Sequence, residues 1–267
     1  MSDLLMQAIP LAIVAATPLL LTVQGELIVQ RSGIINLGVE GMLLAAAFGA
    51  AVTSSIAGGI AAAAIVALIF GVLTIQVRAD QIVTGTAVNL LVLGLTGFLY
   101  RELQLTTPPP FGFDFVTPLA WIVVPLIVAF FLWNTSHGLR LRASGENPEA
   151  LAAPRHYRWM ALAWEALLVG IAGSHLALAL SNGFAENMSA GRGFIALAVV
   201  IFGRWNVSGA VLGTAVFGIA AALQYALQAA NQGIAFHLLL ATPYVVTLLI
   251  LCGVTGHVRA PEALGRR

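Results

Sequence analysis

The chain has 267 residues, of which 60% are hydrophobic and 9% are charged, and its formal net charge is +1. This composition excludes a soluble globular protein of this length and predicts an all-α polytopic membrane protein. A nucleic-acid partner is not expected, because the twelve basic residues, all arginines, nearly balance the acidic ones and leave no basic face.

Eight apolar runs approach the ~20 residues that a helix needs to cross ~30 Å of hydrocarbon. A ninth apolar piece, residues 193–203, is too short to cross alone as a regular helix, so we expect a half-helix continued by irregular chain. The eight longer runs are residues 4–23, 39–57, 60–77, 82–100, 118–133, 159–180, 207–229 and 236–254.

The arginines favour nine spans over eight. If the short piece crosses, alternation places the N-terminus outside and the C-terminus in the cytoplasm, and only Arg101 and Arg192 then lie outside. The alternative is a re-entrant segment at residues 193–203, which moves either Arg204 or the C-terminal arginines to the outer side. The arginines that nine spans place inside are Arg31, Arg78, Arg140, Arg142, Arg155, Arg158, Arg204, Arg259, Arg266 and Arg267.

A charged loop divides the chain, which we treat as one transmembrane domain. Residues 4–136 form the first half, 137–158 a cytoplasmic loop, 159–254 the second half and 255–267 a cytoplasmic tail. Within the loop, residues 140–158 carry six formal charges. They are either a solvated turn or a docking helix for a soluble partner, with Ser144 or Asn147 as N-cap, Pro148 in the first turn and Pro154 as the end.

Two stretches interrupt the apolar pattern with glycines and polar residues. Residues 24–41 (QGELIVQRSGIINLGVEG) join the first two spans, and residues 187–193 (NMSAGRG) precede the short apolar piece. Paired Gly-rich breaks in the two halves are typical of a substrate pathway in transporters. Close helix packing is the alternative, since it also favours small residues.

Four stretches together carry a family resemblance: RSGIINLGVEG from Arg31, DQIVTGTAVNLLVLGL from Asp80, GENP from Gly145 and GFIALAVVIFGRW from Gly193. The chain resembles inner-membrane permease subunits of bacterial ABC importers for nucleosides and simple sugars. Within that family it is similar to the shorter of the two permeases of the nucleoside systems.

The resemblance implies three kinds of protein partner in the bacterial inner membrane and on its two sides. They are a second permease, for which we expect a different chain with a homodimer as the alternative, a cytoplasmic ATPase and an extracytoplasmic binding protein. ATP and Mg²⁺ would be bound by the ATPase, and no cofactor or metal by this chain. Membrane lipid is a further expected partner of the chain. The ATPase is expected to contact the loop at Gly145, Glu146, Asn147, Pro148, Glu149 and Ala150.

Two positions depart from the family pattern. Residues 154–157 read PRHY where the family has a glycine-containing turn, and Glu165 with Ala166 replaces a Ser-Gly pair. A carboxylate inside a span needs a partner. For Glu165 we consider Arg155 or Arg158, a cross-helix polar group or protonation, and we expect an ion pair at the cytoplasmic edge rather than a role in substrate passage.

Polar residues within the motifs are the candidates for a substrate pathway. Asn89 is the first choice, because an amide both donates to and accepts from a nucleobase or sugar, although an interhelical hydrogen bond would explain it equally well. Asn36 and Glu40 are expected to fix the interrupted stretch more than to touch solute. Thr86 completes the set.

Other functional classes find less support. No HExxH, GxSxG or GxxxxGK[ST] motif occurs, so hydrolysis, metal catalysis and ATP binding by this chain are not expected. An ion-coupled secondary transporter or channel remains the alternative, and Glu165 with Glu40 would have to supply the carboxylates that it needs at membrane depth. The resemblance implies a permease that works by alternating access and takes its energy from a separate ATPase.

Overall fold

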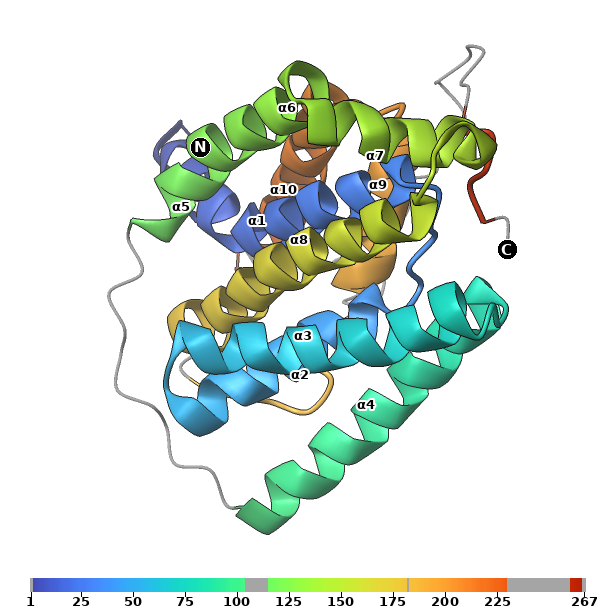
Figure 1. Ribbon diagram of the computed structural model, residues 1–267. Helices are drawn as coiled ribbons and strands as arrows, with labels where there is room; N and C mark the ends of the chain where they lie inside the picture. The colour runs from blue at the N-terminus through green and yellow to red at the C-terminus, as the bar shows by residue number, and fades with distance from the viewer. Residues whose placement is uncertain (1, 104–114, 182, 230–259, 266–267) are drawn as a thin grey trace.

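The computed structural model describes residues 2–103, 115–181, 183–229 and 260–265, and within these ranges every regular element is helical. Figure 1 shows the helices as a bundle with α1 and α8 in its interior. The first half contains α1 (Ser2–Arg31), α2 (Val39–Thr53), α3 (Ile56–Gly71) with a π-helical continuation (Val72–Gln76), and α4 (Gln81–Leu103).

The second group of helices starts with a span made of three consecutive pieces, α5, a π-helical turn and α6. A short helix, α7, and a 3-10 turn then lead into α8. The bounds are α5 (Val116–Pro118), π-helix (Leu119–Val123), α6 (Val124–Asn134), α7 (Ser136–Glu146), 3-10 turn (Pro148–Ala150), α8 (Pro154–His175) with a π-helical end (Leu176–Leu180), α9 (Arg192–Phe202) and α10 (Val207–Ala229).

Five helical segments are long and apolar enough to cross a membrane, which confirms a helical membrane protein. The shorter apolar helices include α2, with 15 residues, and α9, with 11, which are too short to cross alone. The predicted run at residues 236–254 lies outside the described residues. The five long segments are Ala12–Arg31, Ile56–Gln76, Gln81–Leu103, Val116–Asn134 and Pro154–Leu180.

Burial separates the central helices from the peripheral ones. The spans of α1 and α8 are 83% and 78% buried, whereas those of α3, α4 and α6 are only 33%, 28% and 28% buried. The peripheral helices expose large apolar side chains such as Ile65, Val83 and Leu126. In a membrane these faces meet lipid or another chain, so the polar residues that need partners are concentrated on the central helices.

The first span differs from its prediction. The apolar run ends at Val23, but α1 continues to Arg31, and it buries Gln24, Glu26 and Gln30 completely or nearly so. The helix persists because these polar side chains lie inside the bundle, where Gln30 Nε2 donates to Glu26 Oε1 at 2.9 Å. Only residues 32–38 are irregular, so the predicted break at residues 24–41 is shorter than expected.

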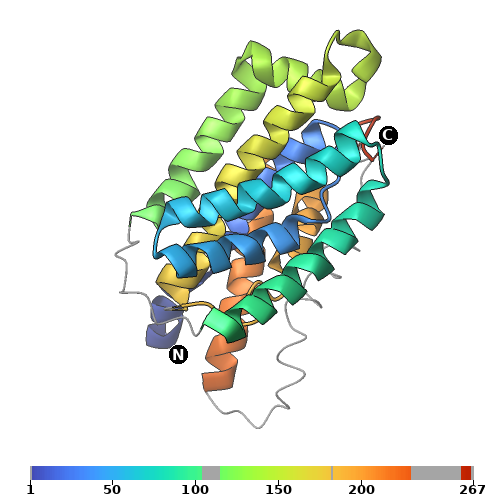
Figure 2. The ribbon, with the colours of Figure 1, turned by 60° about the horizontal axis from the view of Figure 1, so that its bottom comes forward.

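Charged groups gather at two opposite ends of the bundle. At one end, Arg101 in the last turn of α4 pairs at 2.8 Å with Glu186, which lies in the segment between α8 and α9. At the other end, Arg31 lies 3.9 Å from Glu146, at the end of α7. Figures 1 and 2 show α7 and residues 261–265 at the second end, which we call the α7 end.

Candidate functional site

Residues 32–38 connect α1 to α2 and are held by side chains from α4. Gln81 Oε1 accepts from the backbone N–H of Ile35 at 2.7 Å. Asn89 spans the end of the segment: its Nδ2 donates to the carbonyl oxygen of Leu37, and its Oδ1 accepts from the backbone N–H of Gly41, both at 2.7 Å. The Asn89 amide thus makes the interhelical contact considered above, and its contact with solute stays a prediction.

Glu40 joins the first half of the chain to the second. Its Oε1 accepts from Ser189 Oγ at 2.6 Å and from the backbone N–H of Gly191 at 2.8 Å, while Oε2 accepts from the N–H of Gly193 at 2.7 Å. The two N–H groups belong to the start of α9, which has no intrahelical acceptor for them. A carboxylate there also interacts favourably with the positive end of the helix dipole.

Close packing accompanies this contact. A Cβ atom on Gly193 would lie 2.6 Å from the Cα and N atoms of Glu40, so only glycine fits without a backbone shift. The two Gly-rich breaks predicted from the sequence therefore meet in the structure. Glu40 holds the two breaks together through these contacts, and its role in substrate passage stays a prediction.

A buried polar group lies beside this junction, between α1, α8 and the 32–38 segment. Asn36 Nδ2 donates to Glu165 Oε2 at 2.7 Å, and both residues are fully buried. Glu165 also contacts α1 closely, because a Cβ on Gly25 would lie 3.2 Å from the Cα of Glu165. The expected ion pair of Glu165 with Arg155 or Arg158 at the cytoplasmic edge is therefore wrong, and the cross-helix polar partner is correct.

Thr86 does not join the other candidate residues. It lies on the exposed face of α4, where its hydroxyl donates to the carbonyl oxygen of Ile82 at 2.9 Å. A separate hollow of about 550 Å³ lies between α6 and the start of α10, lined by Phe130, Trp133 and Asn206 among others. None of the candidate pathway residues lines it.

The loop at residues 145–150 is arranged differently from its prediction. The expected helix from Asn147 to Ala153 is absent, and instead α7 ends at Glu146 and a single 3-10 turn covers Pro148–Ala150. Pro154 is the first residue of α8 rather than a stop signal, because proline is tolerated at a first helical position, where no N–H is needed. Ser144 caps nothing here and instead donates to the carbonyl oxygen of Ser32 at 3.0 Å.

Burial divides the six loop candidates into two groups. Gly145 is buried against the end of α1: a Cβ there would overlap the carbonyl oxygen of Arg31 and lie 2.9 Å from the N atom of Gly33. The later residues project outward, with Glu146, Asn147, Glu149 and Ala150 exposed and Pro148 half-buried. The loop thus has an anchored base and an exposed tip.

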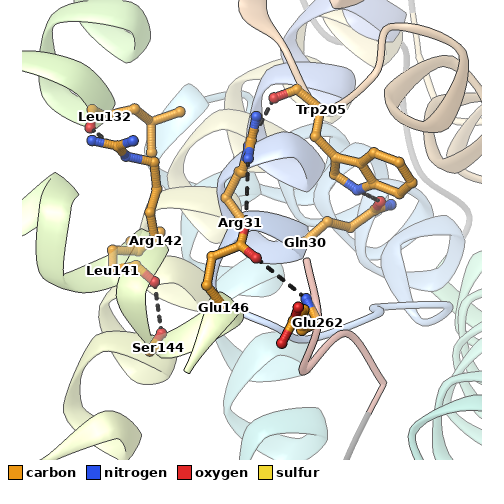
Figure 3. A network of polar contacts seen from close by, with 9 residues as sticks. All are labelled: Gln30, Arg31, Leu132, Leu141, Arg142, Ser144, Glu146, Trp205 and Glu262. Carbon is orange, nitrogen blue, oxygen red and sulfur yellow. Dashed lines mark hydrogen bonds and ion pairs between the residues drawn. The ribbon is translucent and has the colours of Figure 1, made fainter. Parts of the chain in front are cut away.

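Arg31 organises the polar contacts at the base of this loop (Figure 3). Its Nε donates to the carbonyl oxygen of Trp205, just after α9, at 2.8 Å. The Trp205 indole N–H in turn donates to Gln30 Oε1 at 2.7 Å. Arg31 and Arg142 lie 5.4 and 4.9 Å from the Trp133 ring centroid, which fits cation–π contacts. The end of α1 is thereby tied to α7 and to the chain after α9.

Sequence reasoning missed several of these contacts. Ser189 was noted only as part of a Gly-rich break, and Gln30 and Trp205 were not singled out, although an amide within a core helix and an indole both need partners when buried. The contact of residues 261–265 with the loop base left no signal in the sequence. Among the residues the structure describes, no group of three or more His, Cys, Asp or Glu side chains is placed to hold a metal ion.

Comparison with known proteins gives a family assignment. Residues 8–254 match the family model described as branched-chain amino acid transport system / permease component. The chain is 32% identical to the nucleoside ABC transporter permease protein NupC of Lactococcus lactis, over 95% of this chain and 93% of that protein. It is 31% identical to the guanosine ABC transporter permease protein NupQ of Bacillus subtilis, over 96% and 94%.

A third relative is named for a different solute. The chain is 35% identical to the putative glucose ABC transporter permease protein TsgC13 of Haloferax volcanii, over 79% of this chain and 74% of that protein. No solved structure matches the chain. The family match covers almost all of the helices described above, including both Gly-rich breaks and the 145–150 loop, and it confirms the resemblance found in the motifs. The chain belongs to the family of branched-chain amino acid transport system / permease components, as the non-catalytic, multi-pass inner-membrane subunit of an ABC importer.

Proposed function

We propose that this chain imports nucleosides, or simple sugars as the second choice, as half of a permease pair whose partner is a different permease. The names of the relatives support this range, because two are named for nucleosides and one for glucose. An extracytoplasmic binding protein delivers the solute, and a cytoplasmic ATPase drives alternating access. Uptake of labelled nucleosides and pentoses into proteoliposomes that hold the reconstituted importer tests the substrate class.

The observation that carries the coupling proposal is the shape of the 145–150 loop. Its base is buried against Arg31 and Gly33, and its tip exposes Asn147, Glu149 and Ala150. An exposed turn on a packed base is suited to a cleft of a soluble partner, since a force on the tip reaches the end of α1 through close contacts. The ATPase docks there, on residues 145–150.

The proposed topology has nine spans, an external N-terminus and a cytoplasmic C-terminus. In support, Arg31, Arg142 and Glu146 lie together at the α7 end, while Arg101 and Glu186 pair at the other end. This grouping follows the arginine asymmetry of the sequence. Reporter fusions at Ser2 and at Arg267 are the test: an N-terminal fusion that is active only in the cytoplasm would contradict the odd number of spans.

The permease pair is tested by purification. We expect the chain to support ATP-driven uptake only when a second, related permease is present. Full uptake by proteoliposomes that contain this chain as the sole permease, together with ATPase and binding protein, would contradict the heteromer and leave a homodimer.

The pathway residues form part of the same proposal. Asn36, Glu40 and Asn89 all lie on or against the 32–38 segment and the start of α2. We propose that solute passes this junction, where the two Gly-rich breaks meet; Thr86, which lies apart on the exposed face of α4, is not part of it. The contact of Asn89, on α4, with the stretch that holds Asn36 and Glu40 supports the proposal.

A further inference from the structure

Residues 261–265, which we call the C-terminal turn, are bonded to two separate parts of the α7 end. The backbone N–H of Ala263 donates to the carbonyl oxygen of Gly145 at 2.8 Å. Two residues later, the N–H of Gly265 donates to the carbonyl oxygen of Gly33 at 3.0 Å. One short segment thus joins the base of the 145–150 loop to the start of the 32–38 segment.

Packing supports these two hydrogen bonds. Ala263 is only 3% exposed, Pro261 is buried, and Leu264 packs against the core. Gly265 has a φ of +72°, which an L side chain rarely adopts, and a Cβ there would lie 3.2 Å from Ile35 Cδ1. The C-terminal turn is therefore fitted to the 32–38 segment as well as bonded to it.

The two bonded segments also touch one another directly. A Cβ on Gly33 would lie 3.1 Å from the Cα of Gly145 and 3.4 Å from the carbonyl oxygen of Ala263. Three backbones meet here with no side chain between them. Such a contact transmits a displacement well, because densely packed groups yield little.

From this contact a short path leads to the interior. Gly33 is three residues before Asn36, which donates to Glu165, and seven before Glu40, which accepts from the start of α9. In the other direction, Gly145 is followed at once by the exposed tip of the loop. The C-terminal turn thus bonds to both ends of the link between loop and interior.

We propose that the C-terminal turn is a coupling element, which holds the 145–150 loop and the 32–38 segment together so that movement of the loop is passed to the interior of the permease. This rests on the proposed docking of the ATPase on the loop. The coupling is carried by the hydrogen bonds of Ala263 and Gly265. The hydrogen bond from the Glu262 N–H to Glu146 Oε2 contributes little, because it is long at 3.4 Å and exposed.

Loss of the turn is expected to uncouple the importer without unfolding it. Glu262 and Gly265 are exposed, so the turn lies at the surface. Once the turn is removed, water can donate hydrogen bonds to the carbonyl oxygens of Gly145 and Gly33 in its place. The Ser144 hydroxyl still bonds Ser32, and Arg31 still bonds Trp205. The ATPase therefore remains attached to a loop whose movement is poorly transmitted.

The test compares two truncations in the complete importer, reconstituted with ATPase and binding protein. Deleting residues 260–267 removes the turn, and deleting only residues 266–267 leaves it intact. With the longer deletion we expect the ATPase to co-purify and its basal rate to persist, while uptake and the solute-stimulated rate fall roughly tenfold, the coupling that two hydrogen bonds can supply. The shorter deletion should behave as the full chain.

A point variant isolates the hydrogen bond. Ala263→Pro removes the backbone N–H that donates to the carbonyl oxygen of Gly145, whereas Glu262→Ala alters only an exposed side chain. We expect uncoupling in the first and normal uptake in the second. Amide hydrogen exchange in the full chain should show protection at Ala263 and Gly265.

Three results would overturn the proposal: normal solute-stimulated activity after deletion of residues 260–267, equal losses from both truncations, or loss of the ATPase from the truncated permease. The last would make the turn part of the docking surface. Ala150→Trp, measured in parallel, separates this proposal from the docking proposal: normal uptake in that variant refutes docking on the loop, whereas lost uptake there with normal uptake in the truncation refutes only the coupling role.

Discussion

Asn36 and Glu165 are 129 residues apart in the sequence, yet Asn36 Nδ2 donates to Glu165 Oε2 at 2.7 Å in the fully buried core. This contact binds the segment after α1 to the middle of α8. Both groups lie where no lipid or bulk water can satisfy them, so the Asn36 N–H depends on Glu165 as its acceptor.

Replacing Glu165 tests this dependence. Glu165→Leu leaves the Asn36 amide without its acceptor, and we expect the protein to lose about 1–3 kcal/mol of stability. Glu165→Gln keeps a carbonyl oxygen that can accept from Asn36, so its loss should be smaller. Thermal unfolding of the purified permease in detergent measures both, and equal midpoints for the two variants would show that the hydrogen bond is not the reason.

Glu40 is expected to be less tolerant of the same conservative change. Its two oxygens accept three donors, and Glu40→Gln would place an NH₂ group against at least one of them. We predict a loss of about 1–3 kcal/mol and weaker uptake, because the start of α9 loses an acceptor. Glu102→Gln, the same change at an exposed position on α4, is the control and should leave both quantities unchanged.

Asn89→Leu removes both hydrogen bonds to the segment around α2. We expect reduced uptake or a changed preference among solutes, while the ATPase still co-purifies, because Asn89 contacts neither α7 nor the loop. Competition by unlabelled nucleosides and sugars measures the preference. Loss of ATPase binding in this variant, with the protein still folded, would show that Asn89 acts on docking and not on the pathway.

The Arg101–Glu186 pair gives a prediction for pH. Hydrogen bonds from Arg101, with its positive charge, lower the pKa of Glu186 below its ordinary value, so the pair stabilises the fold above the unfolded-state pKa and this contribution is lost as pH falls through the lowered value. Both side chains are exposed, so the effect is small. Arg101→Gln should return the pKa of Glu186 toward its ordinary value, which NMR titration of that carboxyl would detect; an unchanged pKa would show that the pair does not form.

The helical class and most spans could be predicted because the length and hydropathy of an apolar run are local properties. The boundary at Val23 was wrong for a physical reason: Gln24, Glu26 and Gln30 are polar, and only the tertiary structure shows that they lie inside the bundle, where Gln30 bonds Glu26 and Trp205. The helix expected after Asn147 does not form, and the reason is again tertiary: the preceding segment packs on α1 and forms the helix α7 instead.

The candidate site was predicted in its composition more than in its geometry. Asn36, Glu40 and Asn89 were chosen as polar residues within motifs, and the structure places all three at one junction. Their partners could not be predicted, because nothing in a single sequence pairs Glu40 with Ser189, 149 residues away. Thr86 fitted the motif equally well but lies apart, on the exposed face of α4.

We propose that the exposed tip of the 145–150 loop couples this permease to an ATPase. Ala150 is exposed on the 3-10 turn, so a tryptophan there adds bulk to the docking surface without disturbing the bundle. The most direct measurement is solute uptake and solute-stimulated ATPase activity of Ala150→Trp in the reconstituted importer. We predict that both are lost while membrane insertion and solute delivery to the outer face remain, whereas retention of the ATPase with normal uptake would contradict coupling through this loop.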